Sequence, residues 1–189
     1  MQSIKIFVFI LLLAPLFVLV YLGFQDDLTA DPIEYILHYT GLWALRILLL
    51  TLVLTPLKDI TKQAVFLRLR RMIGLYVFFY VSLHLLVYTW LDLELNFAHL
   101  WEDIIERPYI TVGFLAWLIL IPMAATSNKK MIRKLGKKWK TLHKSIYVIT
   151  ILACLHFLWL VKNDLLEPLI YTGIAFVLLF YRLIKYSRS

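Results

Sequence analysis

Six long apolar windows restrict this chain more than any other feature of its sequence. They span residues 5–24, 38–57, 73–91, 109–126, 142–161 and 168–185. A helix needs about 20 apolar residues to cross a hydrocarbon layer roughly 30 Å thick, and each window is close to that length. With 62% hydrophobic residues, the chain has more apolar surface than one soluble core could bury. We therefore predict an all-α, polytopic membrane protein built as a six-helix bundle.

The segments between the windows, roughly 6 to 17 residues each, leave no room for a second domain. The first window has one feature of a signal peptide, because Lys5 precedes it. It is longer than the apolar region of such a peptide, however, and no A-x-A cleavage site follows it. We predict an uncleaved first helix and a single transmembrane domain over residues 1–189.

Charged residues alternate between the loops. The loops after the second and fourth windows and the C-terminal tail hold 15 of the 20 basic residues, whereas the other loops hold 11 of the 12 acidic residues. Because basic residues are retained on the cytoplasmic side of short loops, both termini are expected to be cytoplasmic. Topology and contact with anionic membrane lipid then account for the net charge of +8, and nucleic-acid binding is not expected.

The chain has one cysteine, Cys154, within the fifth window. A single thiol excludes an intrachain disulfide, a thiolate zinc cluster and covalent haem attachment through C-x-x-C-H. We interpret Cys154 as a small packing residue.

Ionisable residues inside apolar spans are costly and often mark functional sites. Measured along ideal helices, His84 lies about 17 Å and His156 about 21 Å from the cytoplasmic ends of their spans. The two spans run in the same direction, so the imidazoles reach a similar depth, and a facing pair suits axial ligation of a haem iron. Hydrogen bonds to neighbouring helices and a proton relay are the alternatives, although no window contains the carboxylate that a relay usually needs.

His143 lies thirteen residues before His156, which places it about 20 Å away along an ideal helix and about 140° around it. A second ligand on the same face would need a π-bulge between them, or an inner haem set to one side. Arg70 stands where the third span would oppose His143, and arginine stays protonated. For Arg70 and Arg71 the alternatives are topological anchoring and contact with a haem propionate or quinone.

Arg46 lies about 12 Å beyond His38 in the second span, too deep to reach water easily. A haem propionate, a quinone oxygen or helix carbonyls could satisfy its guanidinium group. His38 is a reserve ligand candidate, and His99 falls in an outer loop. Both positions are more typical of interfacial residues.

Four segments together resemble one known family. They are ADPIEYILHYTGLWALRILLLTLVLTPL from residue 30, RLRRMIGLYVFFYVSLHLLVYTWLDL from residue 68, ERPYITVGFLAW from residue 106 and LGKKWKTLHKSIYVITILACLHFLW from residue 135. Over nearly its whole length the chain resembles the haem-binding membrane subunits of periplasmic protein-methionine-sulfoxide reductases. This is the MsrQ (formerly YedZ) family, part of the ferric-reductase-like transmembrane superfamily.

The resemblance implies a b-type cytochrome with one or two haem b groups, in which His84 and His156 are paired ligands and His143 is an inner ligand. Relatives in the superfamily usually carry two histidines in each of two helices. Here Arg70 or Arg71 stands where the second histidine of the third span is expected, which leaves the inner haem open.

The resemblance also implies electron transfer across the bacterial inner membrane, from the quinol pool or a cytoplasmic flavin reductase, to the periplasmic molybdopterin subunit MsrP. FMN and quinone are implied as further cofactors. The chain is then an electron-transfer subunit, and its partner reduces methionine sulfoxide. A stand-alone ferric or quinone reductase and a haem-free transporter are the alternatives.

Overall fold

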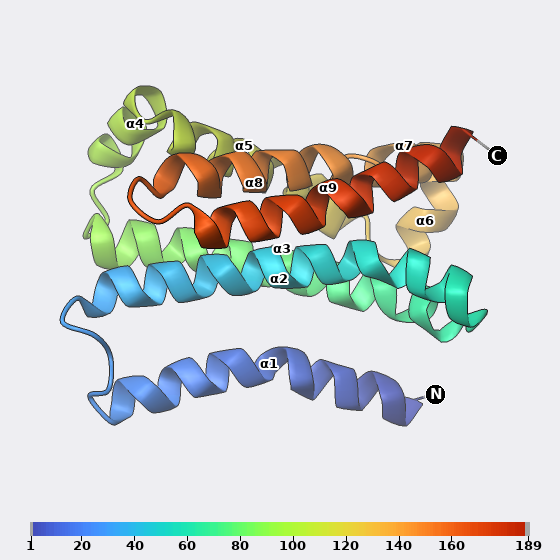
Figure 1. The fold of residues 1–189 in the computed structure, drawn as a ribbon, viewed down its shortest axis with the longest axis horizontal. Coiled ribbons are helices and arrows are strands. Elements are labelled where there is room, and N and C mark those ends of the chain that lie inside the picture. Colours follow the sequence, from blue (N-terminus) through green and yellow to red (C-terminus); the bar gives the residue numbers. More distant parts are fainter. Residues whose placement is uncertain (1, 188–189) are drawn as a thin grey trace.

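The computed structural model describes residues 2–187, and every regular element in this range is helical. The elements are α1 (Gln2–Phe24), α2 (Pro32–Thr61), α3 (Val65–Val87), the π-helical turn η1 (Tyr88–Asp92), α4 (Phe97–Glu106), α5 (Pro108–Ala125), α6 (Lys129–Leu135), α7 (Lys137–His143), α8 (Ile146–Leu160) and α9 (Leu166–Ser187). The long helices run along a common axis as a bundle (Figure 1). The predicted all-α architecture is therefore confirmed for the described residues.

Six segments of the described chain are long and apolar enough to cross a membrane, judged by length and composition. They are Gln2–Phe24, Pro32–Thr61, Val65–Asp92, Pro108–Ala125, Lys137–Leu160 and Leu166–Ser187. Each overlaps one predicted window, so the prediction of a multi-pass protein with six candidate spans is confirmed. The large apolar side chains that these segments expose suit contact with lipid tails.

Helix α2 forms the centre of the bundle. In its most apolar stretch 56% of the residues are buried, against 11% in the corresponding stretch of α9. Helix α2 contacts α3, α8 and α9. The side chains of Thr40, Ile47 and Leu52 are almost inaccessible. Helices α5 and α8 pack against each other, and α5 also contacts α3. His84 near the C-terminal end of α3 thereby lies close to His156 in the C-terminal half of α8.

Tyrosine hydroxyl groups of α2 and α3 attach α1 to the rest of the bundle. They donate to main-chain carbonyls of α1: Tyr76 to Phe9 (3.0 Å), Tyr80 to Leu12 (2.8 Å) and Tyr39 to Pro15 (3.0 Å). A hydroxyl group inside an apolar layer is costly without a partner, so these bonds fix the rotation of α1 about its axis.

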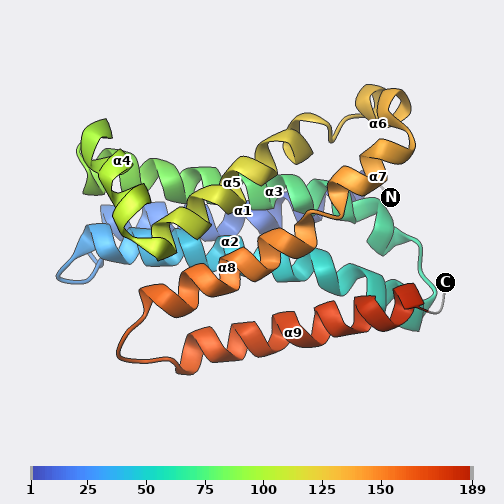
Figure 2. The same cartoon turned by 90° about the horizontal axis from the view of Figure 1, so that it is seen from above.

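The two ends of the bundle differ in charge. Both ends of the described chain, α6 and α7 lie together at one end, and α4 lies at the opposite end (Figures 1 and 2). The first of these ends carries the basic segments of the sequence, and the second carries the acidic loops. The alternation of charge along the chain is thus a separation of charge in space.

The structure departs from continuous α-helices in two of the predicted windows. The fifth window is not one uninterrupted helix, because α7 ends at His143 and a turn at Lys144 and Ser145 precedes α8. A π-helical turn is present at the end of the third span, in η1, and not in the described stretch between His143 and His156. The angle of about 140° between these histidines assumed a continuous helix, so it does not apply.

Candidate functional site

The rings of His84 in α3 and His156 in α8 lie next to each other. Their ring centres are 6.1 Å apart and their ring planes are inclined at 82°. The two residues expected at one depth are therefore in direct proximity, although 72 positions of sequence separate them.

Main-chain carbonyl groups hold both rings. His84 Nδ1 lies 3.0 Å from the Leu37 carbonyl of α2 and 3.3 Å from the Thr40 hydroxyl, and His156 Nδ1 lies 2.7 Å from the Tyr109 carbonyl of α5. Because a carbonyl oxygen can only accept, each Nδ1 carries a proton, which leaves the lone pair on Nε2 in a neutral ring. A second ring nitrogen bonded to a carbonyl is the arrangement typical of a metal-ligating histidine.

The separation of the rings fits one shared metal ion. Two imidazoles bound to the same ion have centres about 6 Å apart, since each metal–nitrogen bond is roughly 2 Å and each nitrogen lies about 1 Å from its ring centre. Within residues 2–187 no group of three or more His, Cys, Asp or Glu could hold a bare metal ion. A haem iron needs only two axial protein ligands, so the pair fits haem better than a free ion.

Two glycines make room for the rings. A Cβ atom built on Gly113 of α5 would lie 2.8 Å from His156 Nδ1, and one on Gly41 of α2 would lie 3.1 Å from His84 Cε1. The first distance is shorter than a normal contact, and the second is tight. The absence of a side chain at these positions therefore lets each ring lie against the neighbouring helix.

His143, the last residue of α7, has contacts separate from those of the pair. Its ring stacks on Trp139 with centres 3.9 Å apart, and its Nε2 is 3.3 Å from the Thr126 hydroxyl. Among the described residues, no second histidine contacts His143. The placement of Arg70 opposite His143 stays a prediction. Arg71 is exposed.

Arg46 has protein partners. Its Nε donates to the Tyr171 hydroxyl (2.7 Å), its Nη2 lies 4.0 Å from the Glu167 carboxylate, and its guanidinium group lies over the Trp43 ring. The Tyr171 hydroxyl and the Glu167 carboxylate were not among the partners considered from the sequence. These partners are protein groups, and contact of Arg46 with a haem propionate or a quinone stays a prediction.

The remaining histidines do not join the pair. His38 is exposed, and its ring lies 5.9 Å from Phe157. His99 is exposed in α4, next to Asn96. Both lie where interfacial residues are expected.

Comparison with known proteins decides the family. The family described as Ferric reductase like transmembrane component matches residues 40–154, a range that includes His84 and His143. A curated relative from Xanthomonas campestris pv. campestris (strain B100), the protein-methionine-sulfoxide reductase heme-binding subunit MsrQ, is 55% identical over 161 residues, which are 85% of this chain and 74% of the relative. The chain belongs to the MsrQ family of ferric-reductase-like transmembrane proteins.

A more distant MsrQ protein, from Bordetella pertussis (strain Tohama I), is 46% identical over 170 residues, which are 89% of this chain and 82% of that protein. The MsrQ protein of Xanthomonas euvesicatoria pv. vesicatoria (strain 85-10) is 54% identical over 166 residues, 88% of this chain and 76% of the relative. The printed names describe these relatives as heme-binding subunits of a methionine-sulfoxide reductase. No solved structure matches the chain.

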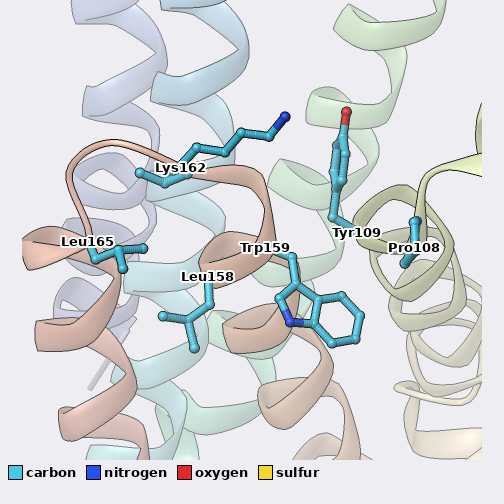
Figure 3. Close-up of a pocket in the computed structure, with 7 residues that line it drawn as sticks. Pro108, Tyr109, Leu158, Trp159, Lys162 and Leu165 are labelled. Atoms are coloured by element: carbon cyan, nitrogen blue, oxygen red, sulfur yellow. The ribbon is translucent and has the colours of Figure 1, made fainter.

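In this MsrQ-family chain an open cavity of about 590 Å³ lies beside the His156 anchor. It is lined by Pro108, Tyr109, Leu158, Trp159, Val161, Lys162 and Leu165. Figure 3 shows the Lys162 side chain extending toward the Tyr109 ring, with the Trp159 ring below both. Tyr109 therefore connects the histidine pair with the cavity. Its carbonyl accepts the hydrogen bond from His156, and its side chain lines the cavity.

Sequence reasoning identified the ring pair of this MsrQ-family chain but not the groups that orient it. The carbonyls of Leu37 and Tyr109 are main-chain atoms, which leave no signal in a sequence. Thr40 is almost fully buried beside His84. Gly41 and Gly113 lie against imidazole rings, and nothing in the sequence indicated these contacts.

Proposed function

We propose that the chain is a membrane b-type cytochrome that carries electrons across the bacterial inner membrane, with His84 and His156 as axial ligands of a haem b. The observation that carries the proposal is the facing pair, 6.1 Å apart, with both Nδ1 atoms bonded to carbonyl oxygens. The names of the MsrQ relatives support the choice of haem.

Bound haem would supply an iron that accepts and releases one electron at a time. The protein supplies the rest of the site. Leu37 and Tyr109 orient the two imidazoles through their carbonyls, and Gly41 and Gly113 let the rings lie against α2 and α5. Fixed neutral rings favour a low-spin iron and a small structural change on electron transfer.

We infer that the basic end of the bundle is cytoplasmic and that the end with α4 faces the periplasm. The concentration of basic residues at the end that holds both ends of the described chain supports this orientation. The haem ligated by His84 and His156 would then lie in the periplasmic half of the membrane. The acidic loops around residues 92–106 would form the docking surface for a soluble partner.

The proposed partner is a periplasmic molybdopterin subunit, MsrP, that reduces methionine sulfoxide. Support comes from the relatives, whose names make them subunits of a protein-methionine-sulfoxide reductase. The proposed donor is the quinol pool or a cytoplasmic flavin reductase. Reconstitution with quinol alone and with a flavin reductase alone would separate the two donors, because only the physiological one should reduce the protein.

A second, inner haem on His143 stays a prediction, with Arg70 as a propionate partner. FMN and quinone sites, and a role for Arg71, also stay predictions, since no described contact assigns residues to them. His143→Ala is expected to leave the low-spin spectrum of the outer haem intact. If an inner haem exists, the variant should halve the haem-to-protein ratio, measured by the pyridine haemochrome assay. A ratio unchanged from that of the parent protein would exclude His143 as a required ligand.

The visible spectrum of the purified protein tests the proposal as a whole. Preparations from haem-sufficient cells should show a Soret band and, after dithionite reduction, sharp α and β bands. A well-folded but colourless preparation would contradict the cytochrome and favour the haem-free transporter. Turnover with ferric chelates in the absence of a partner subunit would favour the stand-alone ferric reductase.

A further inference from the structure

Helix α4 carries three large apolar side chains that no other part of the described chain covers. Phe97, Trp101 and Ile105 are 68%, 64% and 66% exposed. Their spacing of four residues places them in one stripe along the helix. Leu100 and Ile104, which also belong to the apolar side of α4, are partly covered. The bundle therefore covers only part of the apolar side of this helix.

The polar contacts of α4 prevent the stripe from turning inward. Asp103 lies against the bundle with its side chain only 13% exposed, accepts a hydrogen bond from the Tyr88 hydroxyl and lies 2.9 Å from Arg107 Nε. The Thr111 hydroxyl of α5 donates to the Ile104 carbonyl at 2.5 Å. Since a nearly buried carboxylate cannot give up both partners without a large cost, the rotation of α4 is fixed.

Exposed apolar side chains also precede α4 in the chain. Leu86 in α3, Trp90 in η1 and Leu95 in the loop before α4 are 47%, 59% and 51% exposed. Figures 1 and 2 place α4 at one end of the bundle, level with the ends of α2 and α3. A helix at the end of a bundle whose sides face lipid tails lies near the boundary between acyl chains and headgroups.

We propose that α4 is an interfacial helix, with Phe97, Trp101 and Ile105 inserted at the headgroup level of the lipid leaflet at this end of the bundle. Tryptophan is favoured at this depth because its ring is apolar and its N–H group is polar. The exposed acidic residues Glu102 and Glu106 would face water, and their charge disfavours anionic lipid, so zwitterionic headgroups are the expected contact. The inference does not depend on haem.

Single labelled cysteines in phosphatidylcholine vesicles test this placement. In a Cys154→Ser background, Phe97→Cys and Ile105→Cys would each carry an environment-sensitive fluorophore. Glu106→Cys is the matched control, because this exposed position lies about 140° around the helix from the middle of the stripe. We expect lipids with a nitroxide near the headgroup to quench the labels at 97 and 105 several-fold more than the label at 106, and iodide to do the reverse.

Equal quenching by iodide at all three positions would overturn the proposal, because the stripe would then lie in water. Protection of 97 and 105 that develops only after a soluble partner is added would assign the stripe to protein docking instead. Trp101→Cys gives the same reading if either of the other two variants fails to fold. Haem content is not part of the readout, so this test can fail without affecting the proposed function.

Discussion

His84→Ala and His156→Ala are each expected to abolish the low-spin haem spectrum of the outer site. Each change removes one of two nitrogen ligands, and the loss should exceed the roughly 10- to 100-fold drop in metal affinity caused by losing a supporting hydrogen bond. The measurement is the dithionite-reduced visible spectrum together with ferric electron paramagnetic resonance. In the parent protein the near-perpendicular ring planes, inclined at 82°, should give a strongly anisotropic low-spin signal.

Two controls make this result specific. His38→Ala and His99→Ala remove exposed imidazoles outside the pair and should leave the spectrum unchanged. Added imidazole should restore the low-spin bands of His84→Ala, because the small molecule can occupy the vacated position. A low-spin spectrum that persists in both pair variants without imidazole would refute the ligand assignment.

Gly113→Ala is expected to weaken haem binding about 10- to 100-fold, as the loss of a supporting contact to a ligand does. The new Cβ atom would meet His156 Nδ1 at 2.8 Å, so the ring must move away from the Tyr109 carbonyl that holds it. Overpacking of this kind also costs about 1–3 kcal/mol of stability. Haem retention on dilution and the midpoint potential measure the effect.

Gly173→Ala is the matched control, because a Cβ atom at this position has no neighbour within 4 Å. Gly74→Ala gives a second control within α3, the helix that carries His84. Both variants should bind haem like the parent protein. If Gly113→Ala behaves like these controls, the His156 ring does not depend on the space beside α5.

The spans and the histidine pair could be predicted because each depends on position along a single span. Twenty apolar residues identify a span, and depth along two parallel spans places His84 opposite His156. Other contacts between distant segments have no such signal. The Tyr171 hydroxyl that pairs with Arg46 is 125 residues away, and the turn at Lys144 and Ser145 interrupts an apolar stretch without a proline or glycine. The resemblance to MsrQ proteins supplied the cofactor, which residue spacing alone left open among three alternatives.

The carbonyl anchors of the two imidazoles have a consequence for variation within the family. Leu37 and Tyr109 hold the rings with atoms that every amino acid possesses, so substitution of either side chain leaves the acceptor in place. The orientation of the ligands is thus protected from most mutations in the surrounding helices. What the site cannot tolerate is a change in backbone path or an added atom at Gly113. The geometry of the ring pair can then persist while the surrounding side chains vary.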